Sequence, residues 1–276
     1  MIVDGKKIAE EIVAQLVEHR KEFPPKLCLG VLMGEEDAAS ASFVKIKERV
    51  ADKLQVVVVR ELLSNDSTTE FALRALERLS KTCAGVIVQM PLPPQIDLGQ
   101  ILDALPPELD VDAITDQYQG PSSKKYGGRS LLRAPVAEAV SEILVRTDVA
   151  AAGKRAIVVG AGKLVGAPVA DLLRELGADV SIITRNEGSL VDLKEADIVV
   201  LGAGDPGFVK PEMLKEGVVL IDAGTSEASG RLAGDADPKC AEVASVFTPV
   251  PGGIGPIAVA MIFKNLFTLS KEFAKK

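Results

Sequence analysis

Short apolar runs alternate with longer amphipathic stretches along the first ninety residues. The apolar runs are 27–33, 56–62 and 85–90, and the stretches between them are 38–54 and 68–79. Unbroken apolar runs of this length are typical of strands buried on both faces, and the intervening stretches are long enough for helices. The pattern therefore predicts a βαβαβ segment whose parallel sheet is covered by helices on both faces.

A second series of apolar runs follows a region in which the periodicity fails. Pro and Gly crowd residues 105–133, which indicates loops near a domain boundary. A helical pattern returns at 135–145, and the last helix is predicted over 256–273, where we expect it to pack back on the first domain. The strands predicted between these two helices cover 156–160, 179–184, 197–201 and 218–222.

These elements predict an α/β protein of two domains. The first is a three-layer αβα domain made of residues 1–135 plus 257–276. The second is a doubly wound α/β domain made of residues 136–256. A chain of 276 residues with 47% hydrophobic content can bury a core in each.

Composition narrows the class of protein and its partners. A net charge of −7 and the absence of Trp disfavour nucleic acid as a partner. No apolar run approaches the roughly 20 residues of a membrane span, so no membrane partner is expected. Cys28, Cys83 and Cys240 lack metal-ligand spacing, so we expect buried thiols in a reducing compartment, the cytoplasm, and no metal. His19, the single histidine, only borders the apolar stripe of its predicted helix, which favours a surface role over catalysis.

The strongest chemical motif is the segment Gly-Ala-Gly-Lys-Leu-Val-Gly at 160–166, between an apolar run and an amphipathic stretch. Gly160 and Gly162 permit a tight turn and a close approach to a pyrophosphate, which the following helix N-terminus would hold. The spacing differs from the usual G-x-G-x-x-G, so a structural glycine-rich turn is the alternative. A strand before it and a helix after it favour a dinucleotide site, so residues 136–256 are predicted to form a Rossmann-type dinucleotide-binding domain.

Four further motifs occur in a fixed order along the chain. Residues 39–47 are similar to S-x-x-Y-V-x-x-K, residues 85–93 to G-x-x-V-Q-x-P-L-P, residues 110–112 to D-V-D, and residues 248–256 to T-P-V-P-G-G-V-G-P. With the glycine turn, they resemble the bifunctional methylenetetrahydrofolate dehydrogenase/cyclohydrolase family over nearly the whole chain.

The resemblance implies an activity in one-carbon metabolism. The implied reaction is oxidation of 5,10-methylenetetrahydrofolate to the methenyl compound by hydride transfer to NADP, followed by hydrolysis to 10-formyltetrahydrofolate. It also implies that the first domain binds the folate substrate and carries the catalytic residues, and that the protein is a homodimer formed through the dinucleotide domains.

Three residues match the catalytic positions of the family. Lys47 would carry protons, because a partly desolvated ammonium can have a pKa near neutrality. Gln89, at a strand end, would orient Lys47, and Asp112 would bind the pterin ring. The residues alone leave plainer interpretations open: a surface lysine, a glutamine bonded to a loop amide, and a turn-capping aspartate.

Other positions are assigned to binding by the same resemblance. The expected substrate contacts are Phe43, Pro91, Leu92, Pro251, Gly252 and Gly253. The expected cofactor contacts are Gly160, Ala161, Gly162, Val165, Gly166, Arg185, Gly224 and Thr225.

Several positions depart from the family pattern. Phe43 replaces a tyrosine, which keeps the ring for stacking but removes the phenol, and Ala161 replaces an arginine. Arg185 follows the strand at which NAD-specific sites usually carry an acidic residue, so NADP is the predicted cofactor. Glu187 leaves NAD as the alternative.

The departures also leave alternative functions open. Alanines at 113, 134 and 258, where the family has other residues, suggest a dehydrogenase without hydrolase activity, or an oxidoreductase for a different substrate. The changes at Phe43 and Ala161 suggest a non-catalytic protein that binds folate or a nucleotide.

Overall fold

Two compact units make up the protein in a computed structural model that describes residues 1–35, 38–119, 125–126, 129–228 and 231–273. The first unit comprises Glu11–Arg133 and Val259–Lys276. The second comprises Met1–Glu10 and Ala134–Ala258. Residues 1–10 thus group with the second unit, whereas the boundaries drawn from the sequence place them in the first.

The first unit is built around a parallel sheet with strand order β2-β1-β3, so the predicted βαβαβ segment is confirmed. Its strands are β1 Leu27–Gly34, β2 Val56–Leu63 and β3 Gly85–Gln89, with a separate hairpin of β4 Lys125–Tyr126 and β5 Arg129–Ser130. Its helices are α2 Ala38–Lys53, α3 Thr69–Thr82 and α4 Leu98–Ala104, together with parts of α1 Gly5–His19 and α7 Ile254–Phe273.

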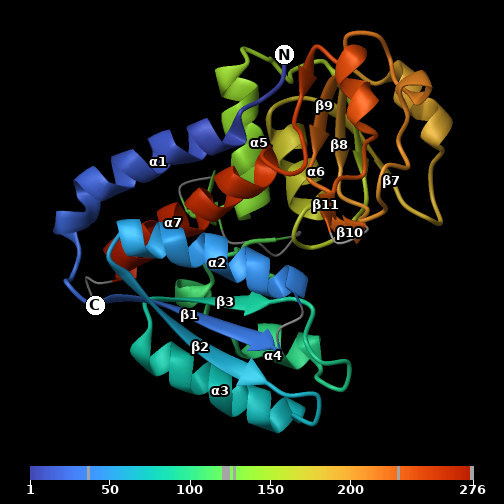
Figure 1. Cartoon of the computed structure of the whole chain (residues 1–276). Helices are drawn as coiled ribbons and strands as arrows, with labels where there is room; N and C mark the ends of the chain where they lie inside the picture. The colour runs from blue at the N-terminus through green and yellow to red at the C-terminus, as the bar shows by residue number, and fades with distance from the viewer. Residues whose placement is uncertain (36–37, 120–124, 127–128, 229–230, 274–276) are drawn as a thin grey trace. The chain divides into compact units, whose positions relative to one another are not determined.

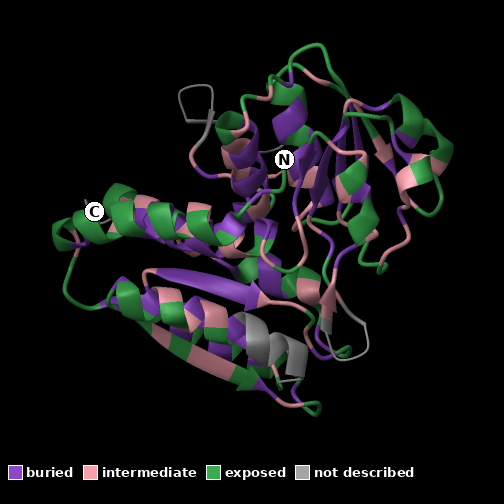
Figure 2. Cartoon of the chain, turned by 45° about the horizontal axis from the view of Figure 1, so that its top comes forward, coloured by how far each residue is buried: buried purple, intermediate pink, exposed green. Residues whose placement is uncertain are grey.

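Alternate residues of β1 face different helices. Val31 and Met33 pack against Val44 of α2. Gly30 faces α3, because a Cβ added there would lie 3.1 Å from the Leu79 side chain. The helices α2 and α3 therefore cover opposite faces of the sheet (Figure 1), and β1 between them is almost wholly buried (Figure 2).

The last helix, α7, packs on the first unit, as the sequence predicts. The Asn265 side chain donates hydrogen bonds to the carbonyls of Val111, at 2.9 Å, and Arg133, at 3.0 Å. The ring centroids of Phe267 and Phe23 lie 4.5 Å apart. By length and composition α7 could cross a membrane, contrary to the expectation of no such apolar run, but 61% of its apolar window is buried inside the protein. Burial of that extent is typical of a core helix.

The second unit contains a parallel sheet with strand order β12-β9-β8-β6-β7. The chain leaves β6 for β7 on one side and returns to β8 on the other, so a switch point lies between β6 and β8. This doubly wound order confirms the predicted fold class. The strands are β6 Arg155–Val159, β7 Asp179–Ile183, β8 Ile198–Leu201, β9 Val219–Asp222 and β12 Val246–Phe247, with the hairpin β10 Ser226–Ala228 and β11 Arg231–Ala233. The α-helices are α5 Pro135–Arg146 and α6 Gly166–Glu175, together with the first residues of α1 and α7. The described residues of this unit also form three short 3-10 helices: η3 Leu190–Glu195, η4 Pro211–Met213 and η5 Pro238–Glu242.

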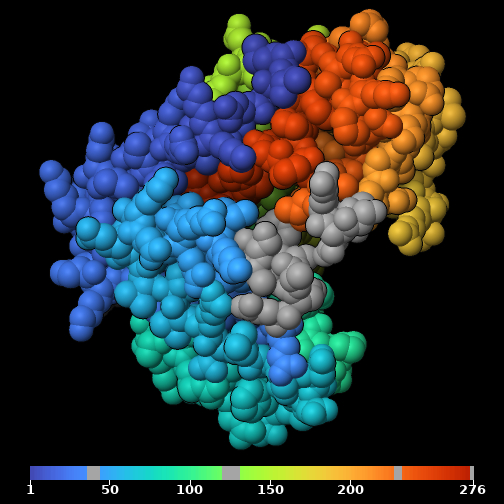
Figure 3. All heavy atoms as spheres, in the orientation of Figure 1, coloured from blue at the N-terminus to red at the C-terminus, as the bar shows by residue number. Residues whose placement is uncertain are grey.

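The N-terminal residues extend this second sheet. Ile2 pairs in parallel with Phe247, and the Met1 ammonium donates to the Ser245 carbonyl at 2.5 Å. Figure 3 shows the dark blue N-terminal residues against the orange segment of the same unit. This pairing explains why residues 1–10 belong to the second unit.

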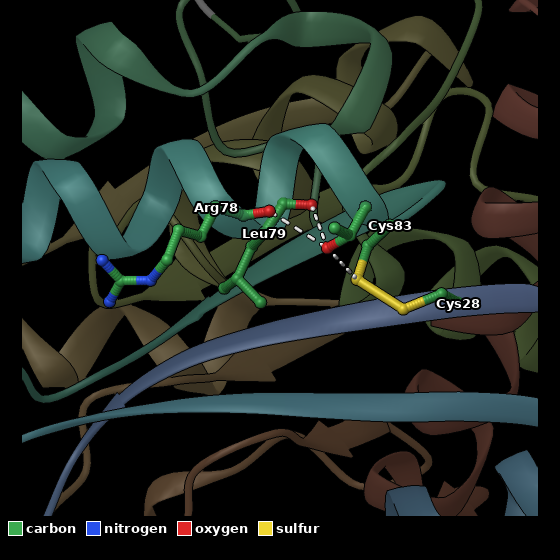
Figure 4. Close-up of a disulfide and its surroundings, with 5 residues drawn as sticks. Cys28, Arg78, Leu79 and Cys83 are labelled. Atoms are coloured by element: carbon green, nitrogen blue, oxygen red, sulfur yellow. Dashed lines mark hydrogen bonds between the residues drawn. A yellow bond between two sulfur atoms is a disulfide. The ribbon is translucent and has the colours of Figure 1, made fainter.

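The cysteines differ in part from expectation. Cys28 on β1 and Cys83 after α3 form a disulfide with Cα atoms 4.6 Å apart (Figure 4). The prediction of free thiols is therefore wrong for this pair. The pairing could not be predicted from the sequence, because 55 residues separate the two cysteines and only the packing of α3 on β1 brings them together. Cys240 is free and buried, as predicted, and burial raises the pKa of its thiol to about 11.

Replacing Asn265 by Ala should destabilise the protein. The variant leaves the carbonyls of Val111 and Arg133 without this donor, and each loss of such a partner costs about 1–3 kcal/mol. Urea unfolding followed by circular dichroism measures the change. The control is Thr268→Ala on the same helix, which should change stability by less than about 0.5 kcal/mol. Equal stability of the two variants would contradict the role given to Asn265.

Candidate functional site

Lys47 and Gln89 form a direct pair in the first unit. Lys47 is three residues after the buried Val44 on α2, so both lie on the helix face that packs on the sheet. Gln89 ends β3, and its Oε1 accepts a hydrogen bond from Lys47 Nζ at 2.5 Å. The Gln89 amide nitrogen donates to the Met90 carbonyl at 3.1 Å, which fixes the orientation of the amide.

Burial changes the acidity of the groups around this pair. The Lys47 side chain is only 8% exposed, and desolvation lowers the pKa of its ammonium, while the charge of Asp112 opposes that shift. Desolvation raises the pKa of Asp112 to about 6, with Lys47 opposing and Asp110 adding to the shift. Lys47 and Asp112 are therefore buried in one electrostatic environment, and the partly buried Gln89 is hydrogen-bonded to Lys47. A lysine in such a place can exchange protons closer to neutral pH than a surface lysine.

A tight turn holds Asp112, and Asp110 closes it. The buried Asp110 carboxylate accepts the backbone N–H groups of Ile114, at 3.2 Å, and Thr115, at 2.8 Å. Ala113 adopts a left-handed conformation with φ +50°, the conformation that glycine tolerates best. No role for Asp110 was predicted from the sequence, in which its place in the D-V-D motif is the only available signal.

A cavity of about 160 Å³ adjoins Gln89 at the carboxyl ends of β1 and β3. Pro91 and Leu92, both predicted substrate contacts, lie in its wall beside Gln89. The side chain of Phe43, another predicted contact, lies outside the described part of the chain. The remaining lining residues are Met33, Gly34, Glu35, Asn65, Pro93 and Pro94.

The glycine turn of the second unit follows β6 at the switch point. Gly160 has φ +107°, and a Cβ added there would lie 2.5 Å from the Gly202 carbonyl oxygen. A Cβ on Gly166 would lie 2.1 Å from the Gly160 carbonyl oxygen, so both positions require glycine. A Cβ on Gly162 would meet nothing within 4 Å. The turn is therefore packed on its inner side and open at Gly162, which fits the approach of a pyrophosphate.

The other predicted cofactor contacts lie at the same edge of the second sheet. Arg185 is exposed in a turn after β7, and this turn is closed by Thr184, whose hydroxyl accepts the N–H groups of Asn186 and Glu187 at 3.3 and 3.1 Å. Gly224 and Thr225 follow β9, Ala161 is exposed in the glycine turn, and the Val165 side chain packs on Gly202.

The proline- and glycine-rich loop before α7 also belongs to the second unit. Gly252 has φ +108°, and the Gly253 N–H donates to the Pro249 carbonyl at 2.7 Å. A Cβ on Gly253 would lie 2.7 Å from that same oxygen. The structure thus places Pro251, Gly252 and Gly253 in a compact loop of the unit that carries the glycine turn, and places Lys47 in the other unit.

Two buried carboxylates at this edge, Asp222 and Asp235, were not predicted from the sequence, and the buried Thr248, the first residue of the 248–256 motif, was given no role of its own. Asp222 ends β9, and burial raises its pKa to about 6. An aspartate at the end of an apolar strand was the available signal for Asp222, while nothing local marks Asp235. Within the described residues, no three His, Cys, Asp or Glu side chains are arranged to hold a metal ion.

A glycine turn at the switch point of one parallel sheet and a desolvated lysine beside another define a two-unit, dinucleotide-binding α/β enzyme. Two family models match the chain: the tetrahydrofolate dehydrogenase/cyclohydrolase catalytic domain over residues 3–112, and the NAD(P)-binding domain of the same family over residues 134–274. The chain belongs to the tetrahydrofolate dehydrogenase/cyclohydrolase family.

Individual relatives agree over nearly the full length. The bifunctional protein FolD of Halothermothrix orenii is 39% identical, covering 96% of this chain and 95% of its own. The methylenetetrahydrofolate dehydrogenase-cyclohydrolase of Trypanosoma brucei, solved with NADP and an inhibitor, superposes with a TM-score of 0.89 at 30% identity over 100% of this chain and 99% of its own. The bifunctional FolD enzyme of Campylobacter jejuni gives a TM-score of 0.88 at 27% identity over 99% of each chain.

Replacing Ala113 by Gly should stabilise the protein slightly. A left-handed alanine costs about 1–2 kcal/mol, and the greater freedom of glycine in the unfolded chain offsets part of the gain, which leaves about 0.5–1 kcal/mol. Thermal and urea unfolding test this. Ala139→Gly, in the interior of α5, is the matched control and should destabilise. A loss of stability in Ala113→Gly would contradict the strained turn.

Proposed function

We propose that the protein oxidises 5,10-methylenetetrahydrofolate to 5,10-methenyltetrahydrofolate by hydride transfer to NADP, and hydrolyses the product to 10-formyltetrahydrofolate. The observation that carries the proposal is the buried Lys47–Gln89 pair beside Asp112, in a chain whose family has this dual activity. NADP, when bound, supplies the hydride acceptor. The protein supplies binding, orientation and proton transfer.

The residues of the second unit fit the dinucleotide. The open side of the glycine turn at Gly162 receives the pyrophosphate, and the N-terminus of α6 faces its negative charge. Arg185, exposed after β7, binds the 2′-phosphate that distinguishes NADP from NAD. The NADP bound by the Trypanosoma brucei relative supports this choice.

Hydrolysis needs proton transfer, which is the task of Lys47. Water adds to the methenyl carbon and loses a proton. The bond from that carbon to N5 then breaks as the hydroxyl proton of the adduct passes to N5, which leaves the formyl group on N10. Lys47 in its neutral form accepts the proton from water, and Gln89 holds the amine in place. Asp112 accepts hydrogen bonds from the pterin ring, and Phe43 stacks on the aminobenzoyl ring without supplying a hydroxyl.

The alternatives are less well supported. A protein that only binds its ligands has no need for a desolvated lysine held by an oriented amide, yet the structure contains both. An oxidoreductase for a different substrate would not be expected to retain Lys47, Gln89 and Asp112 in one environment.

We also propose a homodimer located in the cytoplasm. The family resemblance supports the dimer, and the free, buried Cys240 suits a reducing compartment. The Cys28–Cys83 disulfide gives no support to that location. Light scattering on the purified protein measures the oligomeric state, and a monomeric mass would overturn the dimer.

The reaction and its cofactor are tested together. Mixing 5,10-methylenetetrahydrofolate with NADP should produce reduced cofactor and methenyl product, with a smaller rate for NAD. Arg185→Ala should raise KM for NADP by about tenfold, with little effect on NAD, because a charged contact to the 2′-phosphate is lost. Arg174→Ala, an exposed arginine on α6, is the control. No product with either cofactor would overturn the function, and a wild-type preference for NAD would overturn the role of Arg185.

The proton-transfer role is tested at Lys47 and Gln89. Lys47→Met should lower methenyl hydrolysis by about 100-fold or more, while Lys53→Met, exposed on the same helix, should not. Gln89→Glu places a carboxylate beside the ammonium and raises its pKa. Because the neutral amine is the active form, the rising limb of the pH–rate profile should move to higher pH by about 1–3 units. An unmoved profile would contradict the assignment.

A further inference from the structure

Two buried carboxylates form the framework of the cofactor edge in the second unit. Asp222 and Asp235 are 1% and 0% exposed. Asp222 Oδ1 accepts the N–H groups of Gly224, at 3.0 Å, and Asp235, at 3.2 Å, and its Oδ2 accepts that of Ala236 at 2.9 Å. The described hydrogen bonds of the Asp222 carboxylate are thus with backbone donors on both sides of the β10–β11 hairpin.

Asp235 in turn holds the loop that follows β8. Its Oδ2 accepts the N–H groups of Ala203, at 2.7 Å, and Gly204, at 3.2 Å, and its Oδ1 accepts that of Asp205 at 2.8 Å. Three successive N–H groups converging on one anion form the concave arrangement that many proteins use to bind phosphate. Here the protein's own carboxylate fills that arrangement, so the N–H groups point inward while residues 203–205 remain exposed.

The same loop packs on the glycine turn. A Cβ on Gly160 would lie 2.5 Å from the Gly202 carbonyl oxygen, and a Cβ on Gly202 would lie 2.5 Å from the Val165 side chain. The loops after β6 and β8 therefore flank the switch point in mutual contact, which is where doubly wound sheets bind their ligands. A displacement of residues 202–205 must change the shape of this crevice.

We propose that Asp235 is a positioning residue for the dinucleotide: by gathering the N–H groups of residues 203–205, it holds the loop after β8 in the form that receives the cofactor. The proposal rests on the proposed function for the identity of the cofactor. Asp235 need not touch the cofactor, because its carboxylate lies beneath the loop. A second side chain also holds this loop, because the Ser226 hydroxyl donates a hydrogen bond to the Gly204 carbonyl at 2.8 Å.

The test separates the two activities, because methenyl hydrolysis uses Lys47 of the first unit and needs no dinucleotide. Asp235→Asn turns one acceptor into an N–H donor that faces backbone N–H groups, so the loop should shift. We expect the calorimetric Kd for NADP and the dehydrogenase KM for NADP to rise about tenfold or more, with kcat changed less. Methenyl hydrolysis should remain at the wild-type rate.

The control variant is Asp237→Asn. This carboxylate lies two residues further along the chain and pairs with Lys210 at 3.1 Å. None of its described hydrogen bonds is with residues 203–205. It should leave the Kd for NADP unchanged. If Asp235→Asn shows no cooperative thermal transition, the variant Ser226→Ala tests the positioning of the loop instead. It should raise the Kd for NADP by about two- to fivefold, because one neutral hydrogen bond to the loop is lost.

The outcomes distinguish this inference from the proposed function. An unchanged Kd for NADP in folded Asp235→Asn, or in Ser226→Ala where the first variant does not fold, would overturn the positioning role. An equal loss of hydrolysis and dehydrogenation would also overturn it, because Asp235 would then act only through general stability. A wild-type protein that binds NADP but oxidises no methylenetetrahydrofolate would overturn the function and leave the Kd comparison intact.

Discussion

Desolvation of the Lys47 ammonium is the interaction on which the candidate chemistry depends. A surface lysine is almost wholly protonated near pH 7 and accepts no proton, whereas burial against the sheet destabilises the charged form. Gln89 satisfies the amine with a neutral acceptor, so the amine is hydrogen-bonded without a full counter-charge at contact. Asp112 is itself desolvated and limits how far the pKa of Lys47 falls. The pKa of Lys47 therefore depends on the desolvation of Lys47 and Asp112 and on the attraction between their charges.

The second unit obeys a different constraint, which is the close approach of backbone segments at one edge of the sheet. Gly160, Gly166 and Gly202 stand where any side chain would collide with a neighbouring loop. Buried backbone N–H groups in these closely packed loops still need hydrogen-bond acceptors, and the carboxylates of Asp222 and Asp235 provide them. The glycines set the spacing of the loops, and the aspartates set their shape.

Much of this could be predicted from the sequence because it depends on local patterns. The unbroken apolar run before Gln89 places that residue at a strand end, and the 3.6-residue period of α2 places Lys47 beside Val44. Contacts between distant segments could not be predicted. The Cys28–Cys83 disulfide, the hydrogen bonds of Asp235 and the pairing of residues 1–3 with β12 all depend on tertiary packing, which leaves no local pattern.

The most direct measurement is the pKa of the Lys47 amine itself. Nuclear magnetic resonance of protein carrying isotope-labelled lysine side chains, with Lys47→Met to assign the signal, follows each amine through its titration. If burial lowers this pKa, one resonance that is absent in the variant should titrate below the ordinary lysine value of about 10.4. A Lys47 resonance that titrates with the surface lysines would show that burial does not prepare this amine for proton transfer.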